Sequence, residues 1–203
     1  MSETGKLVQG LASADGRVRQ AAALELYRLG ADRAQAAVRS WAANKDLARL
    51  ISGPPTVGVA VLPGRFSDIR AAWASEGEVP RLAAVPTDQD AREFELRIEF
   101  DGATALLDIL TPRDHADPHS QGEQGALTRF LAKQGEGVQQ VEFPCKDVAR
   151  AAELIGAHFG VQPVYPETRD GADGTRVNFF LVSLPDGSRV LIELFERAAR
   201  NTD

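Results

Sequence analysis

Four polar side chains occupy matching positions in two similar stretches of the chain. Thr56 and Asp108 are 52 residues apart, and Gln140 and Glu193 are 53 residues apart. The first residue of each pair lies near the start of an apolar segment, and the second lies inside a later one. Hydroxyl, amide and carboxylate oxygens together suit a divalent cation such as Mg or Mn. Without a cation the two carboxylates would repel each other, and one should hold a proton near neutral pH.

The segment that contains Thr56 and Asp108 is predicted to form a module with the element order βαβββ. Short apolar runs indicate strands, and an apolar face at helical spacing indicates a helix after the first strand. The pair Asp101-Gly102 is typical of a two-residue hairpin turn. We expect strands at residues 57–61, 82–85, 94–100 and 104–110, and a helix at 66–76.

The same order of elements returns near the C-terminus, which indicates an internal duplication. Asp186-Gly187 again precedes the last strand. We expect strands at residues 138–143, 163–165, 176–183 and 188–195, and a helix at 147–159.

The duplication predicts an α+β fold with a shared concave site. The two βαβββ modules span residues 56–112 and 138–197, and the connecting segment 113–137 includes a short helix around 126–133. If the modules meet edge to edge, equivalent side chains lie on one concave face, because side chains alternate along a strand. We therefore expect the four polar residues to line one cleft.

The chain before residue 54 is predicted to be a separate helical segment, so that the domains are 1–53 and 54–203. It is rich in Ala, Leu and Arg and contains no Pro before Pro54. We expect Asp15 to cap a second helix, Gly30 to end it and Asp32 to cap a third helix. The stretch 11–30 resembles one HEAT-type repeat, but it occurs once. A helical cap or an arm for dimerisation is therefore the preferred interpretation.

Net charge, cysteine count and hydropathy exclude several classes of protein. The formal net charge of −6 argues against partners such as nucleic acid or an anionic membrane, which need a basic surface. Cys145 is the single cysteine, so no intrachain disulfide can form, and a cytoplasmic location is expected. No apolar run has the length of a signal peptide or a membrane span. His115 and His119 lie in a polar loop and are interpreted as solvated rather than as metal ligands.

The second module also resembles a known family. The runs ALTRFLAKQGEGVQQVEF, PETRDGADGTRVNFF and RVLIELFE, within residues 125–196, resemble methylmalonyl-CoA epimerase, a member of the vicinal-oxygen-chelate superfamily that also contains glyoxalase I. The resemblance continues more weakly into the first module through TVGVAV and LLDILTP. It implies a glyoxalase-like cleft between the modules.

The resemblance implies a metal site that is altered in this chain. The family pattern has a His where Thr56 stands, a Gln or Glu at Asp108, a His pair at Gln139 and Gln140, and a Glu at Glu193. The second residue of the pair is the ligand position. Two imidazoles are therefore missing, and imidazole is the ligand that favours Zn, Co, Ni or Fe. We expect no tightly bound metal, or a weakly held divalent ion such as Mg, Mn or Co.

In the epimerase pattern, two carboxylates flank the substrate α-carbon as acid and base. Glu193 matches one of them. The other is expected on the strand that carries Glu93, Glu95 and Glu99 on one face, and Glu95 is the preferred candidate. The usual His-Pro after the VNF strand is replaced by residues 181–183, which read LVS.

Two functions follow from these observations. The preferred one is a small-molecule-binding protein with a degenerate metal site, which sequesters or senses an oxygenated ligand as bleomycin-resistance-type relatives do. The alternative is an epimerase or lyase that abstracts a proton next to a carbonyl, with an acyl-CoA as candidate substrate. A homodimer formed through the helical segment is compatible with either function, because the fold alone does not fix the activity.

Overall fold

The computed structural model describes residues 3–75, 77, 79–113 and 125–197. His115 and His119 lie outside these residues, as does much of the connecting segment. The described helices are α1 (Glu3–Gly10), α2 (Gly16–Ala43), α3 (Lys45–Leu50), α4 (Pro63–Ala74), α5 (Ala126–Gln134), α6 (Val148–Phe159) and the 3-10 turn η1 (Ala172–Gly174). The described strands are β1 (Thr56–Ala60), β2 (Arg92–Phe100), β3 (Ala103–Thr111), β4 (Gly137–Pro144), β5 (Arg169–Asp170), β6 (Thr175–Ser183) and β7 (Arg189–Arg197).

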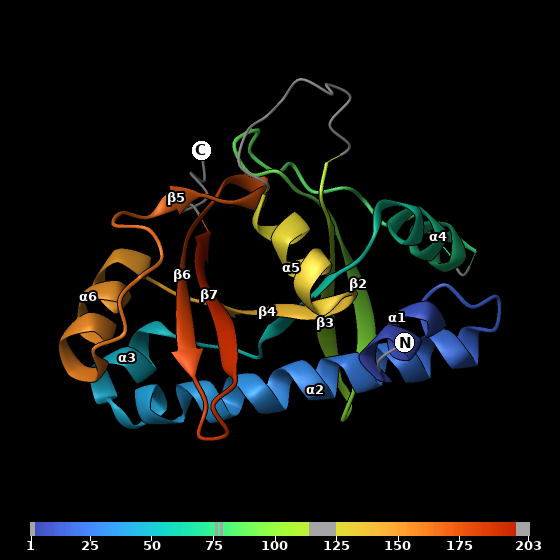
Figure 1. Cartoon of the computed structure of the whole chain (residues 1–203). Helices are drawn as coiled ribbons and strands as arrows, with labels where there is room; N and C mark the ends of the chain where they lie inside the picture. The colour runs from blue at the N-terminus through green and yellow to red at the C-terminus, as the bar shows by residue number, and fades with distance from the viewer. Residues whose placement is uncertain (1–2, 76, 78, 114–124, 198–203) are drawn as a thin grey trace, which may run out of the picture.

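The strands form a mixed seven-stranded sheet in the order β2-β3-β1-β4-β7-β6-β5 (Figure 1). In one module β1 is parallel to β3, which forms a hairpin with β2. In the other module β4 is parallel to β7, which forms a hairpin with β6. The modules meet edge to edge through the antiparallel pair β1–β4. The predicted duplication and α+β fold are confirmed.

Two of the predicted strands are reduced to single bridges. Residues 82–85 pair with the sheet only through Leu82 and Phe94, and residues 163–165 pair only through Pro163 and Phe180. Pro163 cannot donate to a ladder. The backbone N–H of Ala84 instead donates to a side chain in the other module. The hairpin turn predicted at residues 101–102 is present, with both residues at positive φ as such a turn requires.

The N-terminal helices differ from the prediction because α2 runs without a break past Gly30 and Asp32. Gly30 is buried against β1, where an added Cβ would lie 2.4 Å from Val57 Cγ1. The glycine therefore allows a close approach of helix and strand rather than ending the helix. Asp15 caps α2 as predicted, by accepting a hydrogen bond of 2.8 Å from the backbone N–H of Arg17. The HEAT-type resemblance finds no support, since α2 packs along the sheet.

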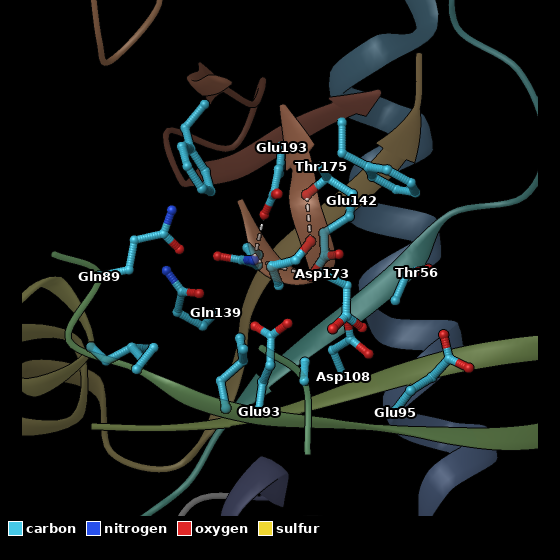
Figure 2. Close-up of a pocket in the computed structure, with 18 of the residues that line it drawn as sticks. Thr56, Gln89, Glu93, Glu95, Asp108, Gln139, Glu142, Asp173, Thr175 and Glu193 are labelled. Carbon is cyan, nitrogen blue, oxygen red and sulfur yellow. Dashed lines mark hydrogen bonds between the residues drawn. The ribbon is translucent and has the colours of Figure 1, made fainter. Parts of the chain in front are cut away.

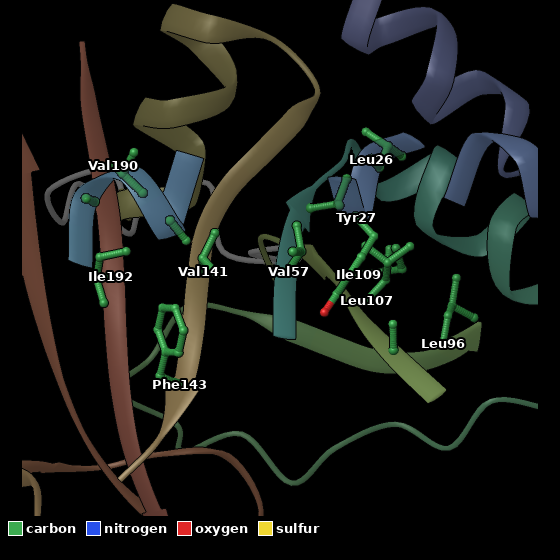
Figure 3. Close-up of a cluster of buried hydrophobic side chains, with 14 of the residues drawn as sticks. Leu26, Tyr27, Val57, Leu96, Leu107, Ile109, Val141, Phe143, Val190 and Ile192 are labelled. Atoms are coloured by element: carbon green, nitrogen blue, oxygen red, sulfur yellow. The ribbon is translucent and has the colours of Figure 1, made fainter. Parts of the chain in front are cut away.

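One hydrophobic core joins the N-terminal helices to both modules (Figure 3). Its sheet residues come from alternate positions of neighbouring strands and have exposures of 0 to 8%: Val57, Leu107, Ile109, Val141, Phe143 and Ile192. Leu26 and Tyr27 of α2 cover their centre. Because the intervening residues point the other way, a second, concave face of the sheet is left for a site. No helix of the described residues is long and apolar enough to cross a membrane.

Candidate ligand-binding cleft

The concave face of the sheet lines a cavity of about 1590 Å³ (Figure 2). Its walls come from both modules, from the loop that precedes β2 and from the loop between β5 and β6. The four residues predicted from the duplication all line it: Thr56, Asp108, Gln140 and Glu193. The structure thus brings the predicted set together, while the role of each residue stays a prediction.

Strand register explains why these side chains meet. Two rows of directly opposed residues cross the sheet: Asp108, Gly58 and Gln140 in the first, and Thr56, Glu142 and Glu193 in the second. Opposed residues share a face of the sheet, so both rows face the cleft. The pair Gly58–Asp108 of the first module corresponds to the pair Glu142–Glu193 of the second. The pseudo-symmetry therefore extends to the residue level.

Gln140 and Glu142 form the centre of the floor. The Gln140 Nε2 donates hydrogen bonds to Glu142 Oε1 at 3.0 Å and to Glu193 Oε2 at 2.7 Å. Gly58 leaves room for them, since an added Cβ would lie 2.7 Å from Gln140 Cγ and 3.3 Å from Glu142 Oε1. Glu142 was not predicted as a site residue, although it lies two residues after Gln140 on one strand and therefore on the same face.

The carboxyl groups of the floor are held in a poorly solvated environment. Burial, followed by the charge of Glu95, raises the pKa of Asp108 to about 7. Burial, followed by the charge of Asp108, raises the pKa of Glu93 to about 8. The pKa values of Glu142 and Glu193 are raised well above the usual range, first by burial and then by neighbouring carboxylates. A side-chain hydrogen bond with Glu142 offsets part of the rise in the pKa of Asp108. The expectation that one carboxyl of the cleft holds a proton near neutral pH stays a prediction.

Of the glutamates on β2, Glu93 lies deeper than the preferred candidate Glu95. The Glu95 side chain is 36% exposed and forms an ion pair with Arg97, with Nε and Oε1 3.2 Å apart. Figure 2 shows Glu93 directed toward the centre of the cleft and Glu95 directed to its side. Both residues line the cavity, as alternation predicts. Burial makes Glu93 the better candidate for the carboxyl opposite Glu193.

A β-bulge turns Gln139 into the same cavity. On β4, Gln140 lies opposite Gly58 and Val138 lies opposite Val59, so Gln139 is an extra residue without a partner on β1. Neighbouring residues of a regular strand point to opposite faces, but Gln139 and Gln140 both line the cavity. The Gln139 Oε1 is buried and has no hydrogen-bond partner among the described residues.

Two loops from different modules bind each other along one side of the cleft. The Asp173 carboxylate pairs with Arg81 and accepts a hydrogen bond of 2.9 Å from the backbone N–H of Ala84. Gln89 Nε2 donates to the backbone carbonyl of Asp170 at 2.6 Å. The hydrogen bond from Arg81 is the main reason why the pKa of Asp173 is lowered. These contacts join the two modules along this side of the cavity.

The side chains present do not fit a tightly held transition metal. Among the described residues, no group of three or more His, Cys, Asp or Glu side chains is arranged to hold a metal ion. At the position of the expected imidazole, Gln140 directs N–H donors toward two carboxyls, whereas a metal ligand must offer a lone pair. Whether a weakly held Mg, Mn or Co ion binds stays a prediction.

Among solved structures, the chain is similar to several methylmalonyl-CoA epimerases. It is similar to methylmalonyl-CoA epimerase from Mycobacterium tuberculosis, with a TM-score of 0.55 and 28% identity over 74% of this chain and 91% of that one. A variant of the Streptomyces coelicolor epimerase in complex with 2-nitronate-propionyl-CoA gives a TM-score of 0.53 and 30% identity over 71% and 93%. An epimerase in complex with methylmalonyl-CoA and NH4+ gives 0.50 and 29% identity over 74% and 95%. No family model and no curated protein matches the chain.

Proposed function

We propose, from the premise that this chain belongs to the vicinal-oxygen-chelate superfamily of methylmalonyl-CoA epimerase, that its cleft binds a small oxygenated molecule without a tightly held metal. The observation that carries the proposal is the Gln140 amide, which bridges Glu142 and Glu193 at the centre of the floor. This amide occupies the place of a metal-binding imidazole and donates a hydrogen bond to each of two buried carboxyls. The protein then sequesters or senses its ligand.

The chemistry of the floor indicates the kind of ligand. Carboxyl groups of Glu93, Asp108, Glu142 and Glu193 line the cavity, and a carboxyl group can accept hydrogen bonds whether or not it is ionised. A hydroxyl or amine on the ligand would act as their partner in place of a metal. Acyl-CoA thioesters are the first class to test, because the similar epimerases bind 2-nitronate-propionyl-CoA in one structure and methylmalonyl-CoA with NH4+ in another.

The test is calorimetric titration of chelator-washed protein with 2-hydroxypropionyl-CoA, an acyl-CoA whose hydroxyl can donate to the carboxyls of the floor. We expect binding to the wild type and to Glu99→Gln, a control on β2 whose exposed side chain lies outside the cavity lining. Binding to Glu193→Gln should weaken about threefold to tenfold, since a net hydrogen bond contributes about 0.5–1.5 kcal/mol. The purified protein should carry less than about half an equivalent of transition metal. Binding that is lost on chelation and restored by Co²⁺ would overturn the proposal.

A second candidate function, proton abstraction next to a carbonyl, is favoured by one observation. Glu93 and Glu193 come from different modules, line the same cavity and have raised pKa values, with that of Glu93 at about 8. A base with a pKa near the working pH is effective in general acid–base catalysis. One carboxylate would take the α-proton, and the protonated partner would return a proton from the other side.

Deuterium exchange distinguishes this second function from binding alone. The α-proton of propionyl-CoA would be followed by NMR in D2O in the presence of the protein. Catalysis predicts exchange with the wild type and none with Glu93→Gln or Glu193→Gln, provided that each variant still binds the thioester. If all three proteins bind it and none exchanges the proton, the chain is a binding protein for this ligand.

A further inference from the structure

The bulge at Gln139 is a local departure from regular strand geometry at the centre of the cleft. The register of β4 against β1 moves by one residue between Gly58 and Val59, and Gln139 is the residue inserted. Without the bulge, Gln139 would point toward the apolar core under α2. With it, the side chain lines the cavity beside Gln140. Such bulges commonly re-aim a side chain next to a functional site.

The two neighbouring glutamines differ in how their amides are used. Gln140 is held by hydrogen bonds of 3.0 and 2.7 Å to Glu142 and Glu193. The carbonyl oxygen of Gln139 is buried and lacks a partner within the described part of the chain. An unpaired buried carbonyl destabilises the protein. The hydrogen bonds to Glu142 and Glu193 therefore explain the position of Gln140, whereas no hydrogen bond within the described part of the chain explains that of the Gln139 carbonyl.

Two amide groups near Gln139 already donate to other acceptors. Figure 2 shows Gln139 between Gln89 and Glu93 on one side of the cleft. Gln89 already donates through Nε2 to the carbonyl of Asp170, and the Gln140 amide already serves two glutamates. The last torsion of a glutamine side chain is broad. Rotation about it can turn the Gln139 carbonyl into the cavity without moving the strand.

We propose that Gln139 is a specificity-determining residue whose carbonyl oxygen accepts a hydrogen bond from an O–H or N–H group of the ligand. This inference rests on the proposed function, and it narrows the ligand class. The cleft takes acyl groups that carry a hydroxyl or an amine, in preference to the same acyl groups without that donor. Gln140 holds the two glutamates of the floor in place, and Gln139 binds the hydroxyl or amine of the acyl group.

The binding test uses two thioesters that differ by one hydroxyl, propionyl-CoA and 2-hydroxypropionyl-CoA. Calorimetric titration should show that the wild type binds the hydroxylated thioester about tenfold more tightly, as one net hydrogen bond contributes. Gln139→Met keeps the length of the side chain and removes the carbonyl. This variant should bind the two thioesters with about equal affinity, because the acceptor that distinguishes them is gone. An unchanged preference in Gln139→Met would overturn the inference.

A second measurement needs no ligand. Urea unfolding should show that Gln140→Met lowers the midpoint, because it breaks two hydrogen bonds to buried glutamates, whereas Gln139→Met leaves the midpoint unchanged or raises it. If Gln139→Met lowers the midpoint as much as Gln140→Met, the residue is structural and the inference is wrong. If the wild type binds neither thioester, the proposed function fails for acyl-CoA, and the unfolding comparison still decides the role of Gln139.

Discussion

The two faces of the sheet are built from the same strands and serve opposite purposes. On β3, Leu107 and Ile109 are fully buried under the helices, while Asp108 between them faces the cleft with its pKa raised to about 7. The convex face buries apolar area and so stabilises the fold. The concave face collects carboxyl groups that are poorly solvated, which lowers stability. Such a costly arrangement is typical of a functional site rather than of a scaffold.

The largest difference in the free energy of unfolding should be that between variants of two adjacent residues of β3, which face opposite sides of the sheet. Ile109→Ala should lower the free energy of unfolding by about 3 kcal/mol, because it leaves a cavity in a closely packed core. Asp108→Asn at pH 8 should leave it unchanged or raise it, because a poorly solvated carboxylate is removed. Urea unfolding of both variants measures the contrast. Equal losses in the two variants would mean that the faces do not differ in this way.

The next largest effect on the free energy of unfolding should come from the contact between α2 and β1. Gly30→Ala should lower the free energy of unfolding by about 2 kcal/mol, because the new Cβ would lie 2.4 Å from Val57 Cγ1 and overpack the core. The control is Gly64→Ala in α4, where an added Cβ meets nothing within 4 Å. Alanine there should stabilise the helix by about 0.5 kcal/mol. A stabilised Gly30→Ala variant would show that helix propensity outweighs the close approach.

The concave face should also make stability depend on pH. The pKa values of Glu93 and Asp108 rise from their ordinary values of 4.5 and 3.8 to about 8 and about 7 in the fold. The folded state therefore binds more protons than the unfolded state between about pH 4 and pH 8, and stability falls as the pH rises through this range. The loss should be on the order of 1 kcal/mol or more.

Thermal or urea unfolding at pH 6 and pH 8 measures this dependence. The double variant Glu93→Gln/Asp108→Asn should show a flatter profile and a higher stability at pH 8 than the wild type. A wild type that is more stable at pH 8 than at pH 6 would contradict the assignment of these two groups.

The smallest effect on stability is expected at the rim of the cleft. Arg81 is 73% exposed, so Arg81→Ala should lower the free energy of unfolding by less than about 1 kcal/mol. Amide hydrogen exchange at Ala84 should become faster, since the Asp173 carboxylate that accepts its N–H loses its partner. Arg150→Ala removes a comparable exposed pair with Glu153 on α6 and should leave Ala84 unchanged. Equal exchange in the two variants would show that Arg81 does not hold the loops together.

Local patterns in the sequence determined most of the sheet and the composition of the site. Alternating apolar residues and two Asp-Gly turns predicted both hairpins, and the repeat of one element order predicted the modules that β1 and β4 join. Because side chains alternate along strands, equivalence between modules was enough to place Thr56, Asp108, Gln140 and Glu193 in one cavity. These features depend on neighbouring residues, so they can be read from the chain alone.

Tertiary contacts decided the rest. Glycine often ends a helix, but Gly30 lies within α2, where the absence of a Cβ lets the helix pass close to Val57. Residues 82–85 have the composition of a strand, yet Ala84 bonds to Asp173 in the other module. Gln139 faces the cleft only because the register of β4 moves opposite Gly58. Each outcome depends on a residue far away in the sequence, and such pairings are absent from any local pattern.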